Sequence, residues 1–146
     1  MNPVSAHTAA PAWPLEAAVR REAHYGERVV TCFTQRPTGL YPMLRDAAAR
    51  APERDALLQG AYRLGYGDLL TQVEHLARAL AAAGVQRGSR AIMLMGNRPG
   101  FVLTLLALQR LGAIAVPVGI REQQPALAYM ANQCEAAAIV FDHELA

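Results

Sequence analysis

The chain has 146 residues, enough for one ordinary domain, and 53% of them are hydrophobic and 18% charged. This composition is more apolar than that of an average globular domain, but it is not that of a membrane protein as a whole. The formal net charge of +2 and the scattered arginines give no support to nucleic acid or an anionic membrane surface as a partner.

Residues 1–35 are expected to form an amino-terminal extension that is partly disordered and contains one short helix. Prolines and small polar residues mark residues 1–13 as a disordered lead-in, and the charged start and apolar core of a signal peptide are missing. Three apolar residues on one helical side predict a short amphipathic helix over Leu15–His24. The β-branched and aromatic residues of Arg28–Phe33 predict a strand.

Residues 36–146 are expected to form the main domain, and its first elements are a helix and a hairpin. The helix is predicted to begin at Pro42, which suits a first helical turn, and to stop before Pro52. Two short apolar runs then flank Gln59-Gly60, which predicts a β-hairpin over Ala56–Leu64.

The next segment contains the clearest helical pattern, followed by a buried strand. Apolar residues at helical spacing predict a helix over Tyr66–Ala83, with Gly84 as its left-handed carboxyl-terminal residue. The apolar run Arg90–Met95 predicts a strand that is buried on both faces. The turn after it predicts a new helix, with Asn97 capping it through its side-chain oxygen and Pro99 in its first turn.

Residues 101–120, FVLTLLALQRLGAIAVPVGI, are long and apolar enough to suggest a membrane-spanning helix. However, Arg110 near the centre of the run would cost about 2.5–3.5 kcal/mol at the middle of a bilayer. Gly112 is a helix-ending residue, and the apolar residues 113–118 after it have the composition of a buried strand. The run is therefore predicted to be a helix and a strand, which disfavours a membrane-anchored protein.

A second crossover follows, with a helix predicted over residues 124–136 and a strand over residues 137–142. The second half of the chain then has the order β-α-β-α-β. This order predicts the α/β fold class, as a partial doubly wound parallel sheet with flanking helices.

The residues themselves reveal no catalytic or metal site. The sequence contains no GxGxxG, no phosphate loop with its lysine, and no serine elbow. Cys32 and Cys134 are far apart and have no metal-ligand spacing with histidines, so buried free thiols in apolar surroundings are expected. We therefore predict no catalytic residue and no metal ligand in this chain.

Arg121 is the one polar residue that we single out as a candidate for ligand binding. It follows the strand predicted at residues 113–118 and so lies near the edge where ligands bind in open α/β sheets. An arginine there can hold a phosphate through a forked contact. The alternative is an ordinary solvated loop arginine close to Glu122.

The order of these elements resembles the amino-terminal part of the AMP-dependent synthetase and ligase superfamily, over about residues 38–142. That superfamily includes acyl-CoA synthetases, the adenylation domains of peptide synthetases, and luciferases. The matching features are a tyrosine before an acidic-leucine pair, two spaced glycines, an asparagine after a strand, a glycine-alanine step, and a strand ending near proline. In this chain they are Tyr66, Asp68-Leu69, Gly84, Gly88, Asn97, Gly112-Ala113 and Val116-Pro117.

The chain departs from the family pattern in two minor ways and one major way. Gly65 stands where the family usually has a serine or threonine that caps the helix, and Ser89 stands where an aspartate is common. The family's glycine-rich phosphate loop, adenine-binding aromatic motif, ribose-binding aspartate and carboxy-terminal lysine are absent. We therefore expect an amino-terminal fragment that is inactive by itself.

The resemblance implies an intact enzyme that uses ATP and Mg²⁺ to activate a carboxylic acid as an acyl-adenylate and passes it to a thiol, with coenzyme A expected as that thiol. In this setting Arg121 is a candidate contact for the phosphates of coenzyme A. A cytoplasmic location, no nucleic-acid partner and no membrane span are expected. The alternative is a small α/β ligand-binding or interaction module that works as it stands.

Overall fold

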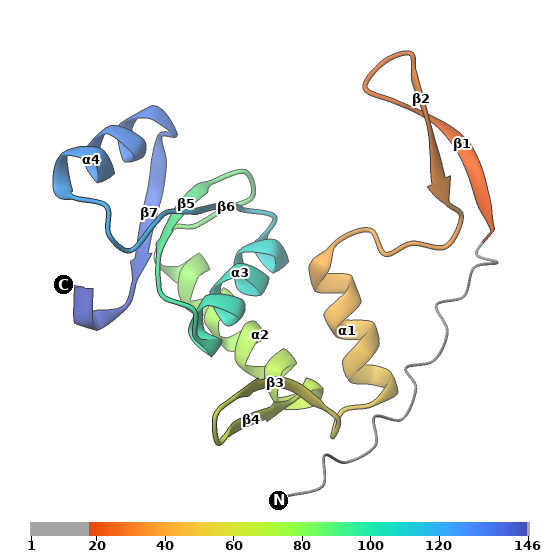
Figure 1. The fold of residues 1–146 in the computed structure, drawn as a ribbon, viewed down its shortest axis with the longest axis horizontal. Helices are drawn as coiled ribbons and strands as arrows, with labels where there is room; N and C mark the ends of the chain where they lie inside the picture. The colour runs from red at the N-terminus through yellow and green to blue at the C-terminus, as the bar shows by residue number, and fades with distance from the viewer. Residues whose placement is uncertain (1–17, 146) are drawn as a thin grey trace, which may run out of the picture. The chain divides into compact units, whose positions relative to one another are not determined.

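A computed structural model describes residues 18–145, which divide into a unit that ends at Arg36 and a unit that begins at Pro37. In the first unit, β1 (Val19–His24) and β2 (Arg28–Phe33) form an antiparallel hairpin (Figure 1). The strand predicted at Arg28–Phe33 is confirmed. The predicted lead-in at residues 1–13 lies outside the described residues.

The helix predicted over Leu15–His24 is wrong for its described part, because Val19–His24 is strand β1. The helical pattern rested on three apolar residues, and long-range pairing outweighs so short a signal. Each residue of β1 pairs with one of β2, from Val19 opposite Phe33 to His24 opposite Arg28. Gly26, with a φ of +84°, lies in the turn between the two strands and adopts the left-handed backbone that glycine tolerates.

The second unit opens with α1 (Leu40–Arg50), the hairpin strands β3 (Asp55–Gln59) and β4 (Tyr62–Gly65), and the long helix α2 (Tyr66–Ala82). These elements confirm the predicted helix before Pro52, the hairpin and the amphipathic helix. The hairpin turn is shifted by one residue, since Gln59 pairs with Tyr62. Helix α2 ends just before Gly84, which has a φ of +94°, as its position in the sequence predicted.

The remaining elements form the parallel sheet and two of its helices. In chain order they are β5 (Arg90–Leu94), α3 (Pro99–Leu111), β6 (Ile114–Pro117), α4 (Gln124–Gln133), β7 (Ala136–Phe141) and a short 3-10 turn, η1 (His143–Leu145). The strand order is β6-β5-β7, and both pairings are parallel. This confirms the predicted α/β fold class with flanking helices.

The core lies between one face of the sheet and helices α1, α2 and α3. Ala91 and Met93 of β5 point to this side and are completely buried, together with Val73 of α2 and Leu108 of α3. On the opposite face Ile139 and Phe141 are about half exposed (49% and 47%). Helix α4, which lies beyond β7 in Figure 1, therefore covers that second face only in part.

Residues 101–120 are not one helix. Helix α3 ends at Leu111, and Gly112 follows it in the left-handed conformation with a φ of +71°. Strand β6 then pairs with β5, as the glycine and the β-branched residues predicted. Among the described residues, no helix has both the length and the apolar character needed to cross a membrane.

Three side chains tie α1, α2 and α3 together at the rim of the core. The hydroxyl of Tyr41 in α1 donates a hydrogen bond to Glu74 of α2, and Nε of Arg110 in α3 lies 3.2 Å from the same carboxylate oxygen. The Arg110 guanidinium also lies 5.3 Å from the centre of the Tyr41 ring, within range of a cation–π contact. These contacts hold the pKa of Glu74 below its ordinary value, chiefly through the Tyr41 hydrogen bond.

We expect Glu74→Gln to reduce the acid sensitivity of the fold. A lowered folded pKa adds stability above the unfolded value of 4.5, and that stability is lost as the pH falls through the folded value. Glutamine cannot titrate, so the variant should lose less stability than the wild type between about pH 5 and pH 3. Urea midpoints across this range measure it, with the exposed Glu53→Gln as control. Identical pH profiles for Glu74→Gln and wild type would contradict the role of this carboxylate.

Candidate functional site

The carboxyl ends of the three parallel strands meet at one edge of the sheet, and the loops that leave this edge form the candidate site. Strand β5 lies in the centre, with β6 on one side and β7 on the other, so the strand order reverses at β5. Ligands of open α/β sheets bind outside the carboxyl ends at such a reversal. The segments at this edge are residues 95–98 after β5, 118–123 after β6 and 142–145 after β7.

Asp142 closes this edge between β5 and β7. Its side chain is buried, and its Oδ2 atom accepts a hydrogen bond of 2.8 Å from the backbone N–H of Gly96. The same oxygen lies 3.4 Å from Nε of Arg98. A buried carboxylate is stable when it is paired and hydrogen-bonded, and here both conditions are met. Asp142 therefore holds the loop after β5 against the end of β7.

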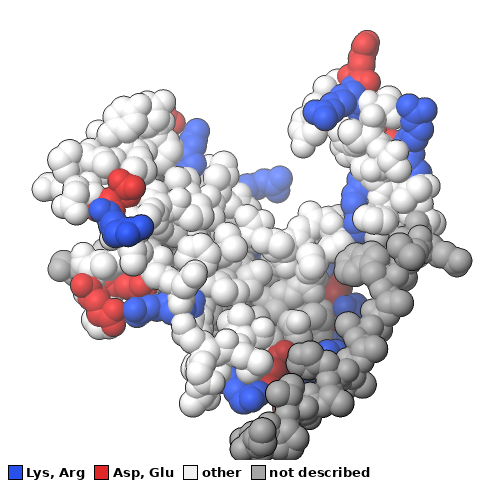
Figure 2. All heavy atoms as spheres, in the orientation of Figure 1, with Lys and Arg blue, Asp and Glu red and all other residues white. Residues whose placement is uncertain are grey.

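Arg98 is shared between two carboxylates. Its NH2 group lies 2.8 Å from Oε2 of Glu144 in addition to the contact with Asp142. The Glu144 hydrogen bond raises the pKa of Arg98, and the same bond lowers the pKa of Glu144. In the space-filling view, acidic and basic side chains lie against one another beside the end of β7 (Figure 2). Arg98 is thus already engaged and is not free to bind an anion.

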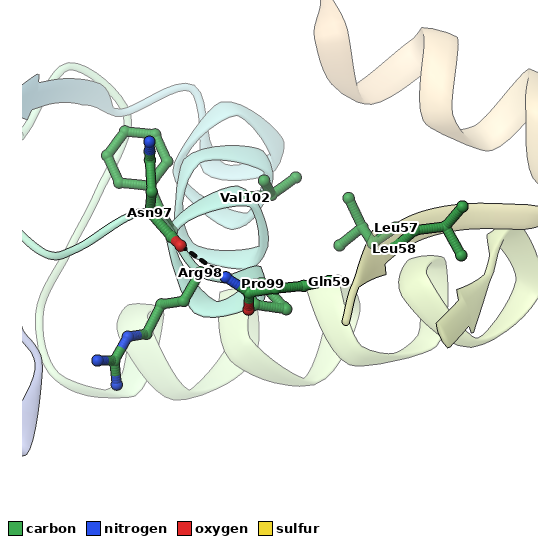
Figure 3. Close-up of a pocket in the computed structure, with 8 residues that line it drawn as sticks. Leu57, Leu58, Gln59, Asn97, Arg98, Pro99 and Val102 are labelled. Carbon is green, nitrogen blue, oxygen red and sulfur yellow. Dashed lines mark hydrogen bonds between the residues drawn. The ribbon is translucent and has the colours of Figure 1, made fainter. Parts of the chain in front are cut away.

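The predicted side-chain cap by Asn97 is wrong. The residue before the first turn of α3 is Arg98, in extended backbone conformation, and no side chain caps the helix. Pro99 occupies the start of the helix as predicted, and it needs no hydrogen-bond partner for its nitrogen. Asn97 instead offers its backbone carbonyl, which accepts a hydrogen bond of 2.8 Å from Nε2 of Gln59 (Figure 3).

A shallow pocket lies between β3 and the start of α3. It has a volume of about 250 Å³, and Leu57, Pro99 and Val102 are among its apolar lining residues. Figure 3 shows that the Arg98 guanidinium extends away from the leucines of β3, so the pocket has little charge inside it. Its chemistry suits an apolar group with one amide contact, through Gln59.

A second pocket of about 470 Å³ lies beside the loop after β6. It is bounded by Leu94 of β5, Ile139 of β7, Leu127 of α4 and Ile120 of the loop. Arg121 lies next to this pocket, in an exposed turn, and does not line it. In the described part of the chain Arg121 forms no ion pair. The structure thus places Arg121 near the carboxyl edge, and its role stays a prediction.

Arg98, Asp142 and Glu144 were not identified from the sequence as residues of this edge. Gly96 and Asp142 are 46 residues apart, and so are Arg98 and Glu144. No motif spacing connects them. A signal was nevertheless present, because Asp142 directly follows a predicted strand, at the end where ligands and polar contacts of such sheets are found. Cys32 and Cys134 are free, as expected, but the expected burial is wrong, because both are only half-buried. Cys32 lies on a two-stranded hairpin, and Cys134 follows α4, which contains no buried residue.

A sequence model of the family described as AMP-binding enzyme matches residues 44–146. A feruloyl-CoA synthase of Amycolatopsis sp is 37% identical over 89 residues, which cover 61% of this chain and 18% of that protein. The fatty acid–[acyl-carrier-protein] ligase MmaC of Mycobacterium marinum is 38% identical over 82 residues, covering 55% of this chain and 15% of that protein. The chain spans less than a fifth of the length of the curated relatives that it matches first.

The fold is similar to that of a solved Mycobacterium tuberculosis fatty acyl CoA synthetase. The TM-score is 0.69 at 25% identity, and the match covers 73% of this chain and 22% of that one. The matched part of this chain therefore corresponds in fold to about a fifth of a larger structure.

Proposed function

The chain belongs to the AMP-binding enzyme family, and on that premise we propose that it forms the amino-terminal part of a longer ATP-dependent carboxylate ligase. In the proposed reaction a carboxylate oxygen attacks the α-phosphorus of ATP, and the bond to the pyrophosphate leaving group breaks. The resulting acyl-adenylate then transfers its acyl group to a thiol, with release of AMP. The observation that carries the proposal is the family match over residues 44–146, which begins within α1 and includes the parallel sheet.

We propose coenzyme A as the thiol acceptor, with a carrier-protein thiol as the alternative. The feruloyl-CoA synthase supports the first acceptor, and the fatty acid–[acyl-carrier-protein] ligase supports the second. The acyl substrate is a carboxylic acid of unspecified type. A cytoplasmic location, where ATP and coenzyme A are available, belongs to the same proposal.

The described residues do not fit an ATP–Mg²⁺ site by themselves. At the candidate edge Asp142 and Glu144 are ion-paired with Arg98, and Glu122 lies exposed in the loop after β6. Among the described residues, no group of three or more potential metal ligands gathers at this edge. A phosphate site would also need backbone amides or basic groups aimed at the ligand. In the proposal, residues outside this chain therefore supply the ATP and Mg²⁺ contacts, and this chain supplies the sheet that supports them.

A chimeric enzyme tests the proposal. Residues 37–146 would replace the matching segment of a feruloyl-CoA synthase, and acid-dependent exchange of pyrophosphate into ATP would be measured. We expect exchange above background, since the fold and the order of elements match those of the family. The same enzyme reassembled with its own segment is the control. A soluble, folded chimera without any exchange would contradict the proposal.

We expect the 146-residue chain alone to show no ATP–pyrophosphate exchange with aliphatic or aromatic acids. The reason is that its sequence lacks the phosphate loop and the lysine that the family uses. Exchange assays with the purified chain and a panel of acids check this expectation. Exchange above background would overturn it, and tight binding of ATP or an acyl ligand without exchange would favour the stand-alone binding module.

We expect Arg121→Ala, in the chimera or in a longer natural protein, to raise the KM for coenzyme A about tenfold. An exposed charge-assisted hydrogen bond to a phosphate is worth about 1.5 kcal/mol, which corresponds to that factor. The adenylation half-reaction should stay nearly unchanged. Steady-state kinetics with coenzyme A varied, together with pyrophosphate exchange, measure both effects. An unchanged KM would show that Arg121 is an ordinary loop arginine.

A further inference from the structure

The hairpin β1–β2 brings three potential metal ligands together on one face. Glu22 and His24 are two residues apart on β1 and so point to the same side, and Cys32 comes from β2. All three are half-buried, unlike Arg21, Ala23 and Thr31 on the other face, which are exposed. One ligand atom from each of the three lies within 4.8 Å of the other two.

One ring nitrogen of His24 contacts both of the other ligand atoms. Nε2 of His24 lies 3.0 Å from Oε2 of Glu22 and 3.7 Å from Sγ of Cys32. A catalytic relay would use the two ring nitrogens separately, one for the carboxylate and one for the thiol. Here both contacts use the same nitrogen, so the arrangement fits a shared central atom better than a relay.

The separations suit a tetrahedral ion. Bonds of about 2.0–2.3 Å from Zn²⁺ to oxygen, nitrogen and sulfur separate neighbouring ligand atoms by roughly 3.2–3.7 Å. The two distances at His24, 3.0 Å and 3.7 Å, lie close to that range. A mixed thiolate, imidazole and carboxylate set is also one that Zn²⁺ accepts. We propose that Glu22, His24 and Cys32 form a Zn²⁺ site on the hairpin, with a fourth position open to water.

Two arginines beside Glu22 affect the affinity of this site for Zn²⁺. Arg36 contacts both oxygens of the Glu22 carboxylate, at 3.0 Å and 2.6 Å, and Nε of Arg20 lies 2.6 Å from one of them. These contacts keep the carboxylate ionised, which is the state that binds a metal. They also repel a cation and compete for the same oxygen, so Arg36 and Zn²⁺ oppose each other at Oε2. Binding of the ion releases the thiol proton of Cys32 to solvent.

The spacing of these residues gave no sign of a site in the sequence. Ligands at positions 22, 24 and 32 match no common zinc pattern, and the segment carrying two of them was predicted to be helical. Only the antiparallel pairing, with Arg20 opposite Cys32 and Glu22 opposite Val30, brings them to one face.

Cobalt(II) titration of the tag-free 146-residue chain tests the proposal. Co²⁺ replaces Zn²⁺ in tetrahedral sites and gives a thiolate-to-metal charge-transfer band in the near ultraviolet. We expect one Co²⁺ per chain with this band, and Zn²⁺ should displace the Co²⁺ and remove it. Cys32→Ser should abolish the band. The control is Cys134→Ser, which removes the other free and half-buried cysteine and should leave the band unchanged.

Three further variants separate the site from unspecific thiol binding. His24→Ala should weaken binding at least tenfold, and Glu22→Gln should weaken it while the charge-transfer band is retained at saturating Co²⁺. Arg36→Ala should tighten binding several-fold, because it removes the competing cation. A missing band in the wild-type chain, a band that survives Cys32→Ser, or a loss of affinity in Arg36→Ala would each overturn the proposal.

Discussion

Leu108→Ala is expected to destabilise the Pro37–Ala146 unit by about 2–5 kcal/mol. Leu108 is completely buried in α3, where it packs in the core between the helices and the sheet. Removing its isobutyl group forfeits the transfer free energy of the buried atoms and leaves a cavity in a close-packed interior. Domains of this size are stable by only about 5–15 kcal/mol, so the loss is a large fraction of the total.

Urea unfolding followed by circular dichroism measures this effect. Leu58→Ala is the matched control, because Leu58 is 60% exposed and its truncation should change the stability by less than about 0.5 kcal/mol. If Leu108→Ala does not fold, Leu108→Met keeps the expectation testable, since a volume-conserving exchange should cost less than about 1.5 kcal/mol. Equal losses for Leu108→Ala and Leu58→Ala would contradict the placement of α3 in the core.

Gly65→Ser is expected to destabilise the fold by about 1–3 kcal/mol, although the sequence alone suggests the opposite. Gly65 precedes the first turn of α2, where serine would normally supply a capping oxygen. In the structure, however, a Cβ atom at Gly65 would lie 2.9 Å from the backbone carbonyl oxygen of Pro52. That carbonyl also accepts the N–H of Gly67, so it cannot move without loss of a hydrogen bond.

Gly39→Ser is the control for this expectation. Gly39 precedes the first turn of α1 in extended backbone, and an added Cβ would lie 3.7 Å from Cδ of Pro42, which is an ordinary van der Waals contact. The same substitution should therefore be neutral or stabilising by a few tenths of a kcal/mol there. Thermal or urea unfolding of Gly65→Ser and Gly39→Ser measures the change in stability of each variant relative to the wild type. A gain in stability for Gly65→Ser would contradict the expectation, since it would show that the backbone at Pro52 shifts at little cost in free energy.

The helices and parallel strands of the second unit could be predicted from the sequence. The apolar period of α2 and the change of pattern at Gly112 are local signals, since both depend on residues within a few positions of one another. They also separated α3 from β6 within residues 101–120 and so argued against a membrane span. The same order of elements indicated the family, which the match over residues 44–146 confirms.

Contacts between distant residues could be decided only by the tertiary structure. The sequence predicts a helix at strand β1 because three apolar residues are too few to distinguish a helix from a strand. Pairing with β2 provides hydrogen-bond partners for the backbone of β1 and so decides in favour of the strand. The contact of Gly96 with Asp142 and the clash that Pro52 imposes at Gly65 join segments that no sequence period connects. Local backbone preferences act over one or two helical turns. Strand register and packing decide which side chains meet across the sheet, and both are set by the whole fold. The same holds across a hairpin, where Glu22 and Cys32 come together.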